Sequence, residues 1–127
     1  MNEPIFLSRE AVDSIHLASL REFGGGDGVR DETALESALA QPLNEYFYRN
    51  ADLFQMAAAY AFHIAENQPY IDGNKRTGLL SALNFLAMNG VLSNQPVDAY
   101  YDAMIAIADK RLDKAGLAGL FRGQLTP

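Results

Sequence analysis

Two helical segments that are apolar on nearly every side, at about residues 52–67 and 74–89, constrain the fold of this chain most strongly. The first combines large apolar side chains with a run of alanines, and the second is rich in leucine. A helix without a polar face is buried on all sides, so we expect these two segments to form the centre of the molecule. The polar residues between them then form a loop with rigid walls.

Weaker helical patterns flank this central pair. Ser8 is a suitable N-cap for a first helix, and Asp31 is one for a second helix that Pro42 is expected to end. No stretch alternates apolar and polar residues as a half-buried strand does. The sequence therefore predicts an all-α fold, a helical bundle in a single domain over 1–127. The expected flanking helices cover about 8–22, 32–41, 96–109 and 113–122.

Residues 42–50, PLNEYFYRN, are expected to form an extended segment or a short hairpin arm. Three consecutive aromatic residues, Tyr46, Phe47 and Tyr48, lie in this segment. Two interpretations fit them equally well. They are core residues, or they form a flap that docks a segment of a target protein.

The composition excludes several classes of protein. The chain of 127 residues has no cysteine, which excludes disulfides, thiolate zinc sites and cysteine nucleophiles. Its net charge of −6 provides no basic face for nucleic acid. The N-terminus is acidic, unlike that of a secretory signal, and the longest apolar run, 56–65, is far shorter than the roughly 20 residues that span a membrane. We therefore expect a soluble, cytoplasmic protein without nucleic-acid or membrane partners.

The loop between the central helices, in the stretch ENQPYIDGNKRTG at 66–78, carries the most specific chemistry. It runs into the N-terminus of a core helix, where unpaired N–H groups favour anions. Gly73 allows close approach of a ligand, Asn74 adds a donor, and Lys75 and Arg76 add charges suited to phosphate. Asp72 is a natural ligand for the magnesium of a nucleotide.

A purely structural interpretation of the same residues is equally compatible with the local sequence. Asp72 can be an N-cap, Asp72-Gly73 a turn, and Lys75-Arg76 a solvated pair. A Walker phosphate loop is excluded because it requires a second glycine ahead of the lysine.

The segment QPYIDGNKRTG resembles the signature loop of the Fic/Doc (Fido) family in its Doc-like, death-on-curing branch. That branch reads approximately H-P-F-x-D-G-N-K-R-T, whereas Fic proper has glycine at the place of Lys75 and a second arginine at the place of Leu79. The similarity extends to SIHLASLREFGG, RDETALESALAQP and LSALNFLAMNG, and so covers nearly the whole chain.

This resemblance implies an all-helical fold and an ATP-using transferase that acts on protein hydroxyls. Fic enzymes mostly transfer AMP, whereas the Doc branch resembles a kinase that phosphorylates a threonine of translation elongation factor Tu and is held in check by an antitoxin. Carried over to this chain, Asp72 is the expected magnesium ligand, Gly73 and Asn74 are expected to cradle phosphate, and Lys75 and Arg76 to neutralise it.

Gln68 departs from the family pattern because the family has its catalytic histidine, the general base, at this position. A carboxamide can orient a hydroxyl but has no useful basicity near neutral pH. Three explanations fit this departure: a weakened enzyme, a binding module that holds nucleotide or antitoxin without chemistry, or a substitution introduced to make a toxic protein expressible. His63 and, less readily, Glu66 are the candidates for a substitute base, although a helix histidine among apolar residues is more often structural.

Two further expectations concern the first helix and inhibition. His16 is expected to be structural, with a position near the loop as the alternative. Some Fic proteins block their own nucleotide site with a glutamate four positions after a serine or threonine, and this chain has no such pair. Inhibition is therefore expected to come from an antitoxin in trans whose disordered tail folds on binding.

Overall fold

The computed structural model describes residues 3–92 and 95–123, and this part of the chain folds into six helices. The predicted all-α class is confirmed, and the bounds of the expected helices agree with the structure within two residues except for the second helix. The helices are α1 Arg9–Phe23, α2 Glu32–Arg49, α3 Leu53–Asn67, α4 Asn74–Met88, α5 Asp98–Ala108 and α6 Lys114–Phe121.

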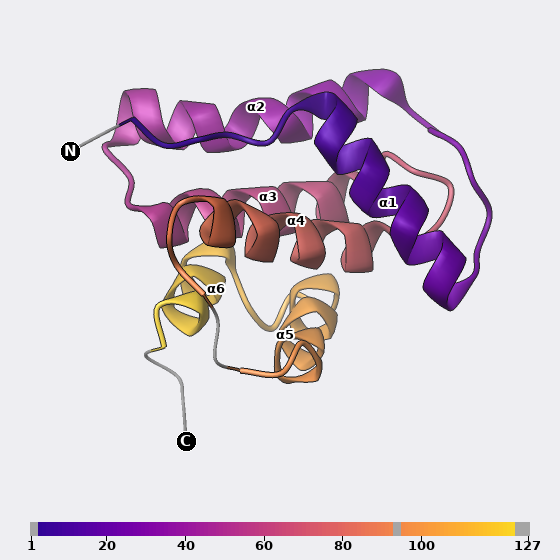
Figure 1. Ribbon diagram of the computed structural model, residues 1–127. Coiled ribbons are helices and arrows are strands. Elements are labelled where there is room, and N and C mark those ends of the chain that lie inside the picture. Colours follow the sequence, from indigo (N-terminus) through magenta and orange to yellow (C-terminus); the bar gives the residue numbers. More distant parts are fainter. Residues whose placement is uncertain (1–2, 93–94, 124–127) are drawn as a thin grey trace.

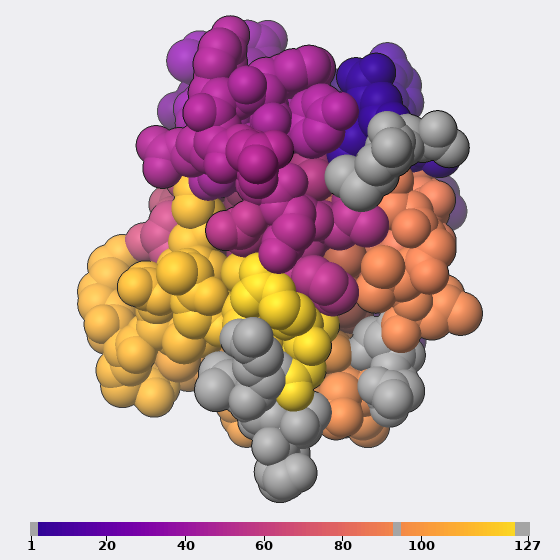
Figure 2. Space-filling model, turned by 90° about the vertical axis from the view of Figure 1, so that its left-hand side faces the viewer, coloured from indigo at the N-terminus to yellow at the C-terminus, as the bar shows by residue number. Residues whose placement is uncertain are grey.

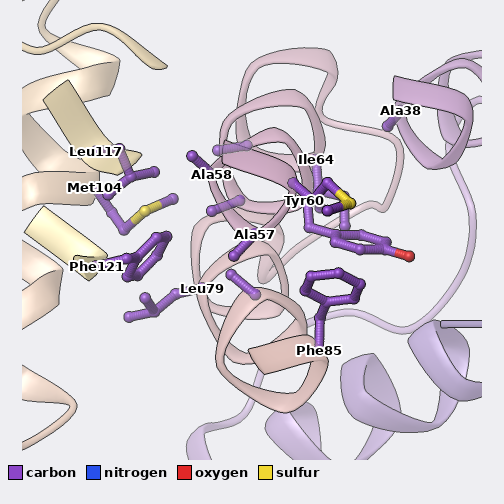
Figure 3. Packing of buried hydrophobic residues seen from close by; sticks show 14 of the residues in the cluster. Ala38, Ala57, Ala58, Tyr60, Ile64, Leu79, Phe85, Met104, Leu117 and Phe121 are labelled. Carbon is purple, nitrogen blue, oxygen red and sulfur yellow. The ribbon is translucent and has the colours of Figure 1, made fainter. Parts of the chain in front are cut away.

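Helices α3 and α4 form the centre of the fold, as their apolar sequences predicted. They share the most extensive contact between any two helices, and α3 also contacts α2, α5 and α6. Figure 1 shows α1 and α2 on one side of this pair and α5 and α6 on the other. Tyr60 and Phe85 meet across the pair with ring centroids 5.2 Å apart (Figure 3). Gly78 of α4 allows the two backbones to approach closely, because an added Cβ would lie 2.8 Å from the Ala61 carbonyl oxygen.

The prediction that Pro42 ends the second helix is wrong, because α2 continues through Pro42 to Arg49. Residues 42–50 are consequently neither an extended segment nor a hairpin arm. Proline removes one helical hydrogen bond and crowds the preceding turn. Pro42 and Glu45, which follow the expected end of the helix, are both buried. The packing of the continued helix therefore outweighs the cost of the lost hydrogen bond.

The three aromatic residues of this stretch therefore lie in the last turns of α2, at the opposite end of α3 from the loop (Figure 1). Tyr46 packs on Phe6 with ring centroids 6.0 Å apart, whereas Phe47 and Tyr48 are exposed. The end of α2 and helix α6 lie next to each other on one face of the molecule (Figure 2). This position separates the aromatic residues from the loop by the length of α3, about 22 Å at the usual rise per residue.

Four helices begin at a side-chain cap. Ser8 and Asp31 accept hydrogen bonds from the N–H groups of the residues three positions later, as predicted for α1 and α2, and Asp113 does the same at the start of α6. Asp52 caps α3 through a reciprocal pair of bonds with Gln55. Within residues 3–92 and 95–123, none of the helices combines the length and the apolar composition that crossing a membrane requires.

Candidate functional site

The loop between α3 and α4 is bounded by two residues in the left-handed backbone region. Gln68 ends α3 with φ 48° and ψ 54°, and Gly73 precedes α4 with φ 78°. The positive φ at Gly73 explains why glycine occupies that position. The chain therefore reverses its direction at both ends of the loop.

The N-terminus of α4 has no side-chain cap, unlike those of α1, α2, α3 and α6. Gly73 occupies the N-cap position, so the structural interpretation of Asp72 as the N-cap is wrong. The first N–H groups of an α-helix have no partner within the helix and carry a partial positive charge. The start of α4 therefore provides hydrogen-bond donors for an anion.

A pocket of about 480 Å³ opens at this helix start. It has the size that small-molecule sites usually have. All six site residues predicted from the sequence line it, together with apolar residues of α3 and α5 and one from the loop itself. The lining residues are Ala65, Gln68, Ile71, Asp72, Gly73, Asn74, Lys75, Arg76, Tyr101 and Ile105.

The two cations of the pocket differ in their surroundings. Lys75 is exposed and contacts no carboxylate of the residues that the structure describes. The Arg76 guanidinium lies over the Phe23 ring, 4.2 Å from its centroid. Burial raises the pKa of Tyr101 although the nearby Arg76 charge opposes it, so the hydroxyl stays protonated at neutral pH. Arg76 is thus oriented between α1 and α5, while Lys75 is free to follow a ligand.

Asp72 is exposed and is held by the segment that joins α1 to α2. The Gly26 N–H donates to Asp72 Oδ2 at 2.7 Å. The other carboxylate oxygen has no partner among the described residues, and no group of three or more His, Asp or Glu side chains that could hold a metal exists among them. Magnesium typically takes one or two protein carboxylates and completes its shell with phosphate oxygens and water. One free carboxylate oxygen beside a pocket that also contains two cations fits that requirement.

Asn74 shapes the loop and also lines the pocket. Its Nδ2 donates to the Tyr70 carbonyl at 2.9 Å, and its Oδ1 accepts from the Tyr70 N–H at 2.9 Å. These bonds hold the conformation of residues 70–74. They use one of the two Nδ2 hydrogens, so the predicted role of Asn74 toward phosphate stays a prediction.

The Gln68 side chain is exposed at the pocket, at the position where the resemblance implies a general base. Arg30 donates to the carbonyl groups of Gln68 and Asn67 and so holds the last turn of α3. The Gln68 backbone is thereby fixed, and its carboxamide lies beside the cations and Asp72.

The segment 24–31 is a part of the site that sequence reasoning missed. It pairs with the loop through the bridge between Val29 and Tyr70, and Ile71 N–H donates to the Gly28 carbonyl at 3.0 Å. Gly25 and Gly26 lie against Asp72, where a Cβ would come within 3.2 Å of its side chain. These glycines are therefore required for close packing against the loop, and the run of three consecutive glycines at 24–26 was the available signal in the sequence.

The substitute bases His63 and Glu66 do not line the pocket. His63 Nε2 lies 3.1 Å from Lys114 Nζ, and Lys114 also donates to Glu45 at 2.6 Å. Because an ammonium group only donates, this nitrogen of His63 accepts and is not available to a substrate. Burial, and secondarily the Lys114 charge, lower the pKa of His63 to about 4. Glu66 forms an ion pair with Lys110.

His16 lies beside the loop, and both interpretations made from the sequence hold for it. Its ring is buried and its Nε2 lies 2.8 Å from the Asp72 carbonyl oxygen. It also stacks on the Tyr70 ring, with centroids 3.8 Å apart. Burial, and secondarily the hydrogen bond to Asp13, raise the pKa of Tyr70 far above its ordinary range.

Comparison with known proteins agrees with this geometry. Residues 6–86 match the model of the Fic/DOC family. The chain is 35% identical over 122 residues to the Toxin Doc of Mycolicibacterium smegmatis (strain ATCC 700084 / mc(2)155), an alignment that covers 93% of this chain and 92% of that protein. It is also 35% identical over 86 residues to the Protein kinase doc of Escherichia phage P1, covering 67% of this chain and 68% of that protein.

Proposed function

Because the chain belongs to the Fic/Doc family, we propose that it is a Doc-like, toxin-type transferase that moves the γ-phosphate of ATP to a hydroxyl of a target protein. A relative is named a protein kinase, which favours phosphate over AMP as the transferred group. The observation that carries the proposal is the uncapped start of α4, which opens into a pocket with two cations and a carboxylate.

The residues of the pocket have separate parts in the proposed reaction. The α4 N–H groups and Lys75 bind phosphate oxygens, and the pre-oriented Arg76 offers a planar pair of donors to the same charge. Asp72 is the residue that would hold Mg²⁺, which supplies charge neutralisation at the phosphates. The acceptor oxygen bonds to the γ-phosphorus as the bond to the β-phosphate bridging oxygen breaks, and ADP leaves. The hydroxyl proton must pass to a base.

Gln68 limits this last step because a carboxamide orients the hydroxyl without accepting its proton. A general base contributes about 10²–10⁴ in rate, whereas phosphoryl transfer depends mainly on positioning and charge neutralisation. We therefore propose a weakened rather than an abolished reaction. The second candidate, a catalytically silent module that binds nucleotide or antitoxin, is favoured by the same glutamine.

Partners follow from the named relatives. A Toxin Doc relative supports control by an antitoxin in trans, and a translation factor such as elongation factor Tu is the proposed protein substrate. A cytoplasmic location is part of the same proposal, because ATP and such a target are found there.

The test is Gln68→His, which places an imidazole at the family's base position. The variant and the parent are incubated with a lysate and ATP labelled at the γ- or the α-phosphate. We expect γ-label transfer to a protein to rise by about 10²–10⁴ in the variant. The control is the same variant with Lys75→Ala and Arg76→Ala, which should neither bind ATP nor transfer label.

The outcomes separate the candidates. Transfer of α-label instead of γ-label would replace the kinase by an AMP transferase. A Gln68→His variant that binds ATP but labels no protein would establish the silent module. Absence of ATP binding by the parent would refute the nucleotide site itself.

A further inference from the structure

The buried imidazole of His16 has no part in the reaction described above, yet it touches the loop at its centre. His16 belongs to α1 and is 3% exposed, and its Nε2 lies 2.8 Å from the carbonyl oxygen of Asp72, 56 positions away in the sequence. A carbonyl oxygen only accepts, so Nε2 must carry the proton and donate it. The tautomer of the neutral ring is thereby fixed with its hydrogen on Nε2.

The ring is also fixed in orientation. It stacks on Tyr70 with centroids 3.8 Å apart and an interplanar angle of 11°. The Tyr70 hydroxyl in turn donates to Asp13 Oδ1 at 2.7 Å, and Asp13 lies one turn before His16 on α1. The other carboxylate oxygen of Asp13 accepts from Arg9 at 2.9 Å. His16 therefore presents its N–H from a rigid position.

The group that His16 holds is the peptide between Asp72 and Gly73. In a trans peptide the carbonyl and the following N–H point in opposite directions. With the Asp72 carbonyl turned to His16, the Gly73 N–H points away from α1. Glycine at the second position makes rotation of such a peptide plane easy, because both signs of φ are accessible to it. Rotation of the plane would put the carbonyl oxygen on the side where the N–H now lies.

We propose that His16 is a positioning residue that locks the Asp72–Gly73 peptide in the anion-binding orientation. This inference rests on the proposed function, because it assigns His16 to the same nucleotide site. Without the Nε2–H donor, the carbonyl loses its buried partner and the peptide samples the rotated state. An oxygen facing the phosphates repels them, so nucleotide affinity falls while the helices remain packed.

The test compares two substitutions of His16 in the full chain, with Mg·ATP as the probe. His16→Phe keeps a flat ring on Tyr70 and removes the donor, whereas His16→Gln places an N–H at the same number of bonds from Cβ as Nε2. We expect the dissociation constant of Mg·ATP, measured by calorimetry, to rise about tenfold or more in His16→Phe, as for loss of one oriented hydrogen bond. In His16→Gln it should stay within about threefold of the parent.

Further readouts distinguish positioning from a merely structural role. The melting temperature of nucleotide-free His16→Phe should lie within a few degrees of the parent, and the Gly73 amide resonance should shift in His16→Phe but not in His16→Gln. In the parent, ¹⁵N spectra at pH 8 should show the hydrogen of the His16 ring on Nε2, a measurement that needs no variant.

Three results would overturn the inference. A hydrogen on Nδ1 alone in the parent contradicts the bond to Asp72. Equal ATP affinity of the parent and His16→Phe removes the positioning role while leaving the proposed function intact. A parent that does not bind Mg·ATP at all refutes the proposed function, and the positioning role with it, so the two failures are distinguishable.

Discussion

Gly78→Ala tests whether the close approach of α3 and α4 supports the fold and the loop that these helices carry. A Cβ at this position would lie 2.8 Å from the Ala61 carbonyl oxygen and 3.3 Å from the Ala61 Cα. Ordinary contacts begin at about 3.4 Å, so α4 must move by about 0.6 Å relative to α3. These are backbone atoms of a central helix, which cannot rotate away as the end of a side chain can.

The cost follows from two opposing effects. Overpacking of a well-packed core costs about 1–3 kcal/mol, and the rigid backbone neighbour places Gly78→Ala near the upper end. Alanine is about 1 kcal/mol more favourable than glycine within a helix. We therefore expect a decrease of about 2 kcal/mol in the free energy of unfolding, which corresponds to a melting temperature lower by about 5–10 °C.

Urea unfolding of Gly78→Ala and of a matched variant, Gly116→Ala, measures the effect. Gly116 lies in α6, where an added Cβ meets the Leu112 Cδ1, the end of a flexible side chain, at 2.5 Å. The free energy of unfolding of Gly116→Ala should remain within about 1 kcal/mol of that of the parent, because Leu112 can adopt another rotamer. A Gly78→Ala variant as stable as the parent would refute the argument from backbone contact.

Acid sensitivity and metal dependence provide the remaining predictions. The pKa of His63 is about 4 in the folded chain, whereas its ordinary value, expected in the unfolded chain, is 6.5. Between these pH values only the unfolded chain binds the proton, so the stability of the folded chain falls as the pH drops from about 6.5 to 4. This loss in the free energy of unfolding, discounted for the partial exposure of His63, is about 1 kcal/mol. Urea unfolding of His63→Gln at the same pH values should not show it. An identical pH dependence in the parent and the variant would contradict the lowered pKa of His63. Asp72→Asn keeps an oxygen that can accept from Gly26 N–H, so thermal unfolding without nucleotide should be nearly unchanged while the magnesium dependence of ATP binding is lost. Undiminished magnesium dependence would exclude Asp72 as the ligand.

The centre of the fold was predictable because its pattern is local and strong. Two segments without a polar face must pack at the centre, and α3 and α4 do, with side chains such as Tyr60, Leu79 and Phe85 fully buried between the other helices. The caps at Ser8 and Asp31 were predictable for the same reason, since a cap and the N–H that it accepts from lie three residues apart. The end of α2 was not, because the burial that outweighs Pro42 involves Glu45 and its ion pair with Lys114, 69 positions later.

The loop residues of the site were predictable from a contiguous motif, but their neighbours were not. Nothing in the first helix distinguishes His16 as a donor to the Asp72 carbonyl, because backbone acceptors leave no trace in a sequence. The same holds for Arg30, whose partners are carbonyl groups at the end of α3. Asn74 has a second role that the motif did not indicate, since its side chain also holds the loop through Tyr70.

The pairing of segment 24–31 with the loop has a consequence for the order of folding. The bond from Gly26 to Asp72 joins residues 46 positions apart, and that from Arg30 to Gln68 joins residues 38 apart. Closing such long connections costs chain entropy that only contacts already formed can offset. We therefore expect the pocket to be completed after α1 has docked on α4 and α2 on α3. In the folded chain these exposed bonds belong to the least protected class, so the site opens locally more readily than the helices beneath it.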